Sequence, residues 1–292
     1  MTKPGRPLTA DGAGTFALGG ELQVRRLGFG AMRVTGEGIW GDPPDPDAAR
    51  ALLRRVVELG IDLVDTADSY GPEVSERLIA EALHPYPSGL VIATKGGFLR
   101  DGPGRWRPDC HPEHLVRACE ASLRRLRLER IDVYQLHTVD RDVPLEESVG
   151  ALTELQQAGK IRHIGLSNVD VDQLRRARQV AAVVSVQNRF NLQDRGDEAV
   201  VEACERDGLG FLAWCPLASG SLARPGGRLD EVADRHGATP AQVALAWLLQ
   251  RSPVMLPIPG TSSVSHLEDN VAAATLRLSA DDLAALDGEA RA

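Results

Sequence analysis

Four ionisable side chains stand at or just after the ends of consecutive apolar segments. Asp65 ends one such segment, and Tyr70 follows it in the next loop. Lys95 and His137 end the next two apolar segments along the chain. Taken singly, an aspartate here could cap a helix, a histidine could belong to a core, and a lysine could extend to solvent. If the segments are neighbouring parallel strands, however, all four side chains converge on one site.

This set of side chains suits the reduction of a carbonyl to an alcohol. The reference pKa of tyrosine is about 10, and a lysine ammonium nearby should lower the pKa of Tyr70. A carboxylate paired with Lys95 would keep the lysine charged and fixed, and His137 could orient the substrate oxygen. Because no side chain donates a hydride, this chemistry requires a cofactor that supplies one.

The elements that must position these residues follow a repeating order. Eight apolar segments cover residues 26–32, 61–66, 90–95, 131–137, 161–167, 182–187, 209–214 and 254–260. Amphipathic helical patterns separate them, as at 47–60, 112–128 and 238–251. Eight such repeats predict an α/β fold of the (β/α)8 TIM barrel class, whose active sites lie at the carboxyl ends of the strands.

A doubly wound sheet is the main alternative fold. Its dinucleotide fingerprint GxGxxG fails in the first apolar segment, because Arg33 occupies the place of the third glycine. The segment 15–24, with two glycines at its centre, predicts a β-hairpin ahead of the barrel. Residues 1–13 are predicted to form a disordered tail, and residues 14–292 a single barrel domain.

Composition and charge exclude several classes of protein. The 292 residues are 43% apolar, with a formal net charge of −8, and basic residues form only short clusters, so no nucleic-acid partner is expected. No run reaches the roughly 18 apolar residues of a membrane helix, and the N-terminus lacks a signal-peptide core, so we expect a cytoplasmic protein without membrane contact. Cys110, His111 and His114 lack a nearby fourth ligand, and no metal site is expected.

Seven motifs resemble those of the aldo-keto reductase superfamily and occur in the same order. They are LGFGAM (27–32), DTADSYG (65–71), TKGG (94–97), QLH (135–137), IGLSN (164–168), VQNRFN (186–191) and IPGTSSVSHLEDN (258–270). The last motif is similar to that of a bacterial branch that includes pyridoxal reductases. The resemblance implies a barrel that binds NADP(H) in extended form. It also implies a catalytic tetrad of Asp65, Tyr70, Lys95 and His137, with Tyr70 as the general acid.

The resemblance further implies which residues contact the cofactor. Ser167, Asn168 and Gln187 would hydrogen-bond the nicotinamide carboxamide. Trp214 would stack on the nicotinamide ring, with Phe190 as the second candidate for that role. The remaining expected contacts are Gly30, Met32, Asp65, Pro216, Leu217, Gly220, Leu222, Gly260, Thr261, Ser262, His266, Asp269 and Asn270.

One departure from the family pattern affects the choice of cofactor. Many members carry a lysine and an arginine around the 2′-phosphate, where this chain has Gly260 and His266. Losing two cations weakens a charge-assisted interaction with phosphate, although nearby hydroxyl groups and helix N–H groups could partly compensate. NADPH is therefore the expected cofactor, and NADH is the alternative.

The substrate pocket is expected to be open and lined by aromatic side chains. Trp40, Phe98 and Trp106 lie in the segments that follow the first and third strands, although Trp106 could simply pack within its own loop. The sequence thus predicts a monomer or weak homodimer that reduces small aldehydes, and ketones with them, with NADPH.

Other functions fit the residues less well. A barrel metallohydrolase could use Asp65, Asp68 and His137 as metal ligands. It would leave Lys95 and Tyr70 without a role. A sugar-phosphate isomerase would leave the motifs IGLSN and VQNRFN unused. The alternative that retains these motifs is a regulatory protein of the same fold that binds NADPH, like the potassium-channel β subunits.

Overall fold

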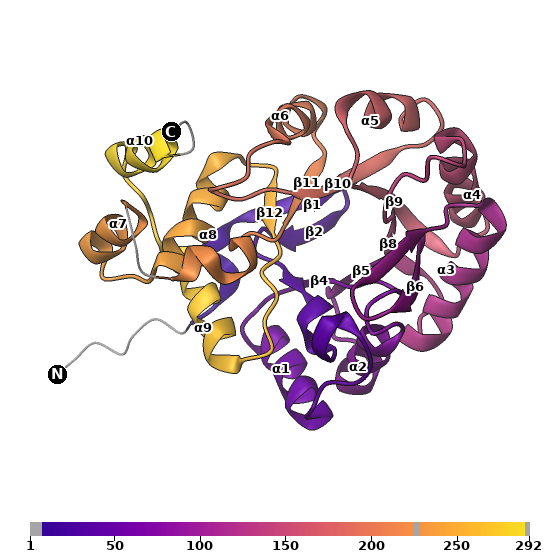
Figure 1. Ribbon diagram of the computed structural model, residues 1–292, viewed down its shortest axis with the longest axis horizontal. Helices are drawn as coiled ribbons and strands as arrows, with labels where there is room; N and C mark the ends of the chain where they lie inside the picture. The colour runs from indigo at the N-terminus through magenta and orange to yellow at the C-terminus, as the bar shows by residue number, and fades with distance from the viewer. Residues whose placement is uncertain (1–7, 225–227, 290–292) are drawn as a thin grey trace.

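The computed structural model describes residues 8–224 and 228–289, in which eight parallel strands form one sheet (Figure 1). The strands are β3 (Phe29–Gly30), β4 (Leu63–Asp65), β5 (Val91–Gly96), β8 (Ile131–Leu136), β9 (Ile161–Ser167), β10 (Val183–Arg189), β11 (Gly210–Trp214) and β12 (Met255–Pro257). Neighbours in this sequence order are also neighbours in the sheet. Each strand overlaps one of the eight apolar segments, so the predicted (β/α)8 barrel is confirmed.

The barrel closes where its first and last strands meet. The Gly28 N–H donates a hydrogen bond to the Pro257 carbonyl at 3.0 Å. A Cβ atom on Gly30 would lie 2.7 Å from the Ile258 carbonyl oxygen, and one on Gly260 would lie 2.5 Å from the Gly30 oxygen. Only glycine permits such close approach of two backbones, so Gly30 and Gly260 are required at this seam.

Helices surround the sheet in Figure 1. The α-helices are α1 (Pro46–Glu58), α2 (Val74–Leu83), α3 (Pro112–Leu126), α4 (Leu145–Gln157), α5 (Val171–Ala177), α6 (Glu198–Asp207), α7 (Arg228–His236), α8 (Pro240–Arg251), α9 (Val264–Ala272) and α10 (Ala280–Glu289). The 3-10 helices are η1 (Ala10–Ala13), η2 (Ala31–Val34), η3 (Glu37–Ile39), η4 (Ala218–Ala223) and η5 (Ala273–Thr275). The three predicted helical patterns coincide with α1, α3 and α8. Local signals start two of these helices: Asp45 caps α1, and Thr239 with Gln242 forms a capping box on α8.

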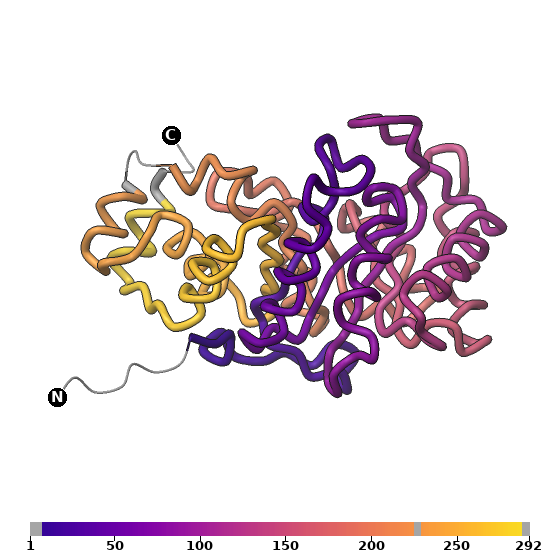
Figure 2. The backbone as a smooth tube through the Cα atoms, turned by 90° about the horizontal axis from the view of Figure 1, so that it is seen from below, coloured from indigo at the N-terminus to yellow at the C-terminus, as the bar shows by residue number. Residues whose placement is uncertain are grey.

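The predicted N-terminal hairpin is present and covers the end of the barrel opposite the candidate site. Strands β1 (Thr15–Leu18) and β2 (Leu22–Arg25) pair antiparallel, and this segment is the indigo part of the lower edge in Figure 2. Leu18 and Val24 are buried with Leu63 and Leu256, which lie inside the barrel. The hairpin therefore closes the amino end of the barrel with apolar side chains.

Two segments differ from expectation. Ala10–Ala13 is a 3-10 helix whose Ala10 N–H donates to the Leu59 carbonyl, so the prediction of a disordered tail is wrong for these residues. Ala10 and Ala13 are buried in one cluster with side chains of α1. The local sequence does not reveal this packing. Residues 1–7 lie outside the described residues. The second difference is an unpredicted hairpin of β6 (Phe98–Gly102) and β7 (Arg105–Pro108), which follows β5.

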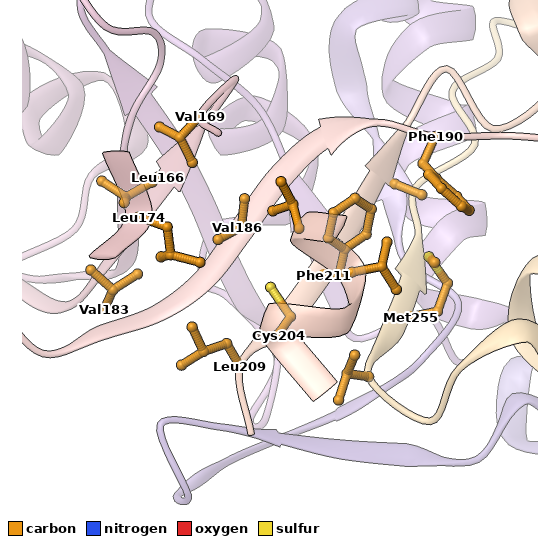
Figure 3. Packing of buried hydrophobic residues seen from close by; sticks show 14 of the residues in the cluster. Leu166, Val169, Leu174, Val183, Val186, Phe190, Cys204, Leu209, Phe211 and Met255 are labelled. Atoms are coloured by element: carbon orange, nitrogen blue, oxygen red, sulfur yellow. The ribbon is translucent and has the colours of Figure 1, made fainter. Parts of the chain in front are cut away.

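A hydrophobic layer joins the sheet to the helices (Figure 3). Val186, Phe211 and Met255 of three neighbouring strands and Cys204 of α6 are fully buried in one cluster. Burial raises the pKa of the Cys204 thiol to about 12, so this cysteine acts as a small apolar side chain. The layer fixes the strands, and hence the positions of the side chains at their carboxyl ends.

A glycine-to-alanine pair tests the seam. Gly30→Ala should lower the free energy of unfolding by about 1–3 kcal/mol, because its methyl group would meet a backbone oxygen that cannot turn away. The matched control is Gly150→Ala in α4, where no atom lies within 4 Å of the added Cβ. That change should raise stability by about 0.5–1 kcal/mol. Chemical denaturation measures both, and equal effects of the two changes would contradict the account of the seam.

Candidate active site

A buried lysine–aspartate pair lies at the carboxyl end of the barrel. The Lys95 side chain is 0% exposed, and its Nζ lies 2.7 Å from Asp65 Oδ2. Nζ also donates to the Thr66 carbonyl at 2.8 Å and to the Tyr70 hydroxyl at 3.2 Å, which uses all three ammonium hydrogens. Burial by itself lowers the pKa of Lys95, but Asp65 and Tyr70 outweigh burial, and the pKa is raised. Lys95 is therefore a permanent cation.

Two glutamines complete the surroundings of the Asp65 carboxylate. Its Oδ1 accepts hydrogen bonds from Gln135 Nε2 at 2.9 Å and from Gln187 Nε2 at 2.7 Å. Gln135 was not among the predicted site residues, although its place two residues before His137 on β8 was the available signal. Gln187, which is expected to hydrogen-bond a nicotinamide carboxamide, uses its amide nitrogen for Asp65. Both carboxylate oxygens are thus held in place.

Tyr70 is a neutral phenol beside this cation. Its side chain is buried, and burial raises its pKa above the usual value by more than the Lys95 ammonium lowers it. Lys95 lowers the pKa of Tyr70 as expected, but the sequence did not reveal the larger cost of burying a phenolate. At neutral pH the Tyr70 hydroxyl carries its proton and can donate it.

The His137 ring packs edge-on against the Tyr70 ring, with the ring centroids 5.8 Å apart. Burial, followed by the charge of Lys95, lowers the pKa of His137 well below its usual range. The imidazole is therefore neutral at pH 7. Its Nδ1 lies 3.4 Å from the Ser69 hydroxyl. A neutral histidine next to a cation can donate a hydrogen bond to an oxygen without adding a second positive charge.

Two of the three predicted pocket residues meet the tetrad. The Phe98 ring lies 4.8 Å from the His137 ring and 5.5 Å from the Trp106 ring. Trp106 also lies 6.3 Å from Tyr70. Trp40 is 36% exposed, and its backbone forms a bridge with Gly71 of the Tyr70 loop. Trp106 therefore does more than pack its own hairpin.

The ends of two more strands, β9 and β11, are tied to His137 through Asn168. Asn168 Nδ2 donates to the His137 carbonyl at 3.0 Å and to the Ser167 hydroxyl at 3.1 Å. The Trp214 indole N–H donates to Asn168 Oδ1 at 3.1 Å. Ser167, Asn168 and Trp214 are therefore brought together in one hydrogen-bonded group. Phe190 is excluded from this group, because its ring is fully buried and stacks on Trp247 in the core.

Backbone strain concentrates beside this group. Seven non-glycine residues of the described chain have positive φ, and four of them are Asn168, Cys215, Ala218 and Ser219. Such conformations cost free energy and persist at functional sites, where surrounding structure enforces them. The strained loop carries Pro216, Leu217 and Gly220, which were predicted to contact a cofactor, whereas the Leu222 side chain is buried in the core. The loop fits a ligand that is held by backbone groups.

The segment after β12 presents some predicted contacts and not others. Ser262 and His266 are exposed at the start of α9, while Thr261 and Asn270 are buried. The Asp269 carboxylate accepts hydrogen bonds from Thr239 and Gln242 of α8, so it is committed to that helix rather than presented to a ligand. Met32 is half-buried in η2, next to the Gly30–Gly260 seam. That seam also explains the departure at position 260, because a lysine there would clash with the Gly30 oxygen.

Asp68 is a half-buried residue with a buried carboxyl oxygen, and the sequence did not single it out for the predicted chemistry. Its Oδ1 has no hydrogen-bond partner among the described residues. Burial and the nearby Glu76 carboxylate raise its pKa to about 8, although Arg125 acts in the opposite direction. Asp68 is therefore protonated in the folded chain at neutral pH.

Within residues 8–224 and 228–289, no three His, Cys, Asp or Glu side chains are grouped as metal ligands. Asp65, which a metallohydrolase would need, is held by Lys95. No helix in this part of the chain is long and apolar enough to cross a membrane.

Comparison with known proteins identifies similar chains. A family model described as the aldo/keto reductase family matches residues 26–290. An uncharacterized oxidoreductase of Schizosaccharomyces pombe is 52% identical over 97% of this chain and 92% of its own length. Pyridoxine 4-dehydrogenase of Escherichia coli is 45% identical over 95% of this chain and 98% of its own. A crystal structure of an aldo/keto reductase from Klebsiella pneumoniae, in complex with NADP and acetate, is 30% identical with a TM-score of 0.80, covering 94% of each chain.

The raised pKa of Asp68 leads us to predict an unusual dependence of stability on pH. Between about pH 4 and pH 8 the folded chain keeps a proton on Asp68 that the unfolded chain has released. The free energy of unfolding should therefore fall as the pH rises through this window, as far as this group is concerned. Asp68→Asn should remove that contribution. The free energy of unfolding of the variant, relative to that of the wild type, should therefore rise when the pH is raised from 5 to 8.5. Denaturation curves at both pH values measure this difference. The same difference between variant and wild type at pH 5 and at pH 8.5 would contradict the raised pKa of Asp68.

Proposed function

This chain belongs to the aldo/keto reductase family of oxidoreductases, and from that premise we propose that it reduces aldehydes, and ketones with them, to alcohols at the expense of NADPH. One observation carries the proposal: the Lys95 ammonium is shared between the Asp65 carboxylate and the Tyr70 hydroxyl. A phenol beside a fixed cation, with a neutral imidazole next to it, is a proton donor prepared for a carbonyl oxygen.

Each residue has a distinct role in the proposed reaction. When bound, the nicotinamide supplies a hydride to the carbonyl carbon. Tyr70 donates its proton to the oxygen, which has become a stronger base than a phenolate. Lys95 stabilises the resulting phenolate, and Asp65 holds the Lys95 ammonium in place. His137 donates a hydrogen bond that orients the carbonyl oxygen.

The residues around the tetrad fit a nicotinamide dinucleotide. We assign Ser167 and Asn168, with the remaining oxygen of Gln187, to the carboxamide, and Trp214 to the face of the ring. The strained loop that follows Trp214 would hold the pyrophosphate through its backbone. The segment from Gly260 to Asn270 would meet the adenosine end. The NADP in the Klebsiella relative supports NADPH, while the missing cations at Gly260 and His266 keep NADH as the alternative.

We propose small aldehydes with a flat ring as the preferred substrates. Phe98 and Trp106 give the pocket an aromatic wall within 6.3 Å of the Tyr70 and His137 rings. The name of the Escherichia coli relative, pyridoxine 4-dehydrogenase, makes pyridoxal the first candidate. The complete hydrogen-bonded set of Asp65, Lys95 and Tyr70 favours an enzyme over a regulatory protein that only binds NADPH.

The proposal is tested by following NADPH consumption at 340 nm. The panel contains 4-nitrobenzaldehyde, pyridoxal, methylglyoxal and a sugar, with NADH run in parallel. We expect turnover with at least one aldehyde and a preference for NADPH. Tight NADPH binding without turnover of any carbonyl would instead support the regulatory alternative, and no binding of either nucleotide would contradict the proposal.

Replacing the proton donor separates chemistry from binding. Tyr70→Phe should lower kcat by about 10²–10⁴-fold, since it removes the general acid, and should leave the Kd for NADPH within a few-fold of the wild type. The matched control is Tyr86→Phe, whose hydroxyl binds only the Leu126 carbonyl on the outside of the barrel. Normal turnover by the Tyr70 variant, or an equal loss in the Tyr86 variant, would rule out this role for Tyr70.

A further inference from the structure

Arg100 of β6 binds three separate loops through its guanidinium group. Nη1 donates to the carbonyls of Ile39 at 2.9 Å and Ser69 at 2.8 Å, Nη2 to those of Gly38 at 3.1 Å and Gly102 at 3.4 Å, and Nε to that of Arg105 at 3.3 Å. All five N–H donors of the side chain are therefore used by backbone oxygens. No donor is left for a substrate anion.

These acceptors belong to the parts of the chain that form the mouth of the site. Gly38 and Ile39 lie in the loop after β3, Ser69 precedes Tyr70, and the last two acceptors lie in the β6–β7 hairpin. Ser69 also places its hydroxyl 3.4 Å from His137 Nδ1. Arg100 thus connects the loop that contains Tyr70 to the hairpin that carries Phe98 and Trp106.

The flat face of the guanidinium supports the aromatic wall. Its central carbon lies 3.8 Å from the centroid of the Trp106 ring and 5.7 Å from that of Trp40. Trp106 in turn lies 6.3 Å from Tyr70 and 6.2 Å from His137. Arg100 therefore stacks on a ring that also contacts two side chains of the tetrad.

The charge of Arg100 is not needed for an ion pair. No carboxylate oxygen lies within 4.0 Å of its guanidinium among residues 8–224 and 228–289, and carbonyl dipoles take the place of a counter-ion. A lysine at this position would offer three donors from one point and no flat face. The number and direction of the arginine donors, rather than the charge, match the surroundings.

We propose that Arg100 is a positioning residue that fixes the Phe98–Trp106 wall relative to Tyr70 and His137, and thereby selects carbonyl substrates that carry a ring. The kinetic half of this inference rests on the proposed reductase function, whereas its structural half does not. The hydrogen bonds and the stacking of Arg100 together form a clamp on this wall. Without the clamp, a ring aldehyde loses a surface against which to align. A small aldehyde such as methylglyoxal, which does not reach the wall, loses nothing.

Hydrogen–deuterium exchange tests the clamp without reference to activity. Arg100→Gln should speed exchange in the hairpin 97–109 and in the loop 36–41, and leave the N-terminal hairpin unchanged. The matched control is Arg107→Gln, which removes an exposed cation from the same hairpin, where it pairs only with Asp101. If the exchange rates of these segments do not change in the Arg100 variant, or if they rise equally in both variants, the proposed clamp is wrong.

Kinetics test the selection of substrates. For 4-nitrobenzaldehyde, Arg100→Gln should raise KM about ten-fold, while kcat/KM for methylglyoxal and the Kd for NADPH stay within about two-fold. Arg100→Lys keeps the charge and should resemble the glutamine variant. Wild-type behaviour of the lysine variant, or equal losses with both aldehydes, would overturn the proposal. If the wild type turns over no carbonyl of the panel, the reductase function fails, and the exchange experiment still decides the clamp.

Discussion

The buried ammonium of Lys95 imposes the constraint on which the rest of the site depends. A cation without solvent is tolerable only if a counter-charge and hydrogen-bond acceptors surround it, and breaking such a pair typically costs about 3–5 kcal/mol. Asp65, the Thr66 carbonyl and the Tyr70 hydroxyl supply those partners. Two glutamines then bind the second oxygen of the carboxylate, so five side chains from four strands and a loop are fixed by one requirement. The same requirement leaves the Tyr70 hydroxyl next to a permanent positive charge.

The barrel and its loops contribute differently to this arrangement. Strands buried on both faces place Asp65, Lys95 and Gln135 at the same end of the barrel, and packed helices hold the strands. The loops carry the costs: strained backbone at Asn168 and after Trp214, and a buried protonated carboxyl at Asp68. Arg100 then connects the loops to one another, as Asn168 connects the strand ends. Rigid strands thus position the proton donor, and cross-linked loops shape the space in front of it.

The sequence predicted what depends on local pattern and chain order. The eight strands follow from short apolar runs, and the meeting of Asp65, Tyr70, Lys95 and His137 follows from their places at or just after strand ends. It did not predict features that depend on distant burial or on the positions of backbone oxygens. The raised pKa of Tyr70, the role of Gln135 and the five acceptors around Arg100 are of this kind. Ala10–Ala13 was misread for the same reason, because its order comes from packing on distant helices.

A double-variant cycle in turnover tests the central claim that Asp65 and Lys95 act on Tyr70 as one unit. NADPH-dependent reduction of 4-nitrobenzaldehyde is measured for Asp65→Asn, Lys95→Met and the variant that carries both changes. If the pair acts together, each single change should lower kcat about as much as the double change does. Losses that multiply in the double variant would show that the two residues act independently, and the account would then be wrong.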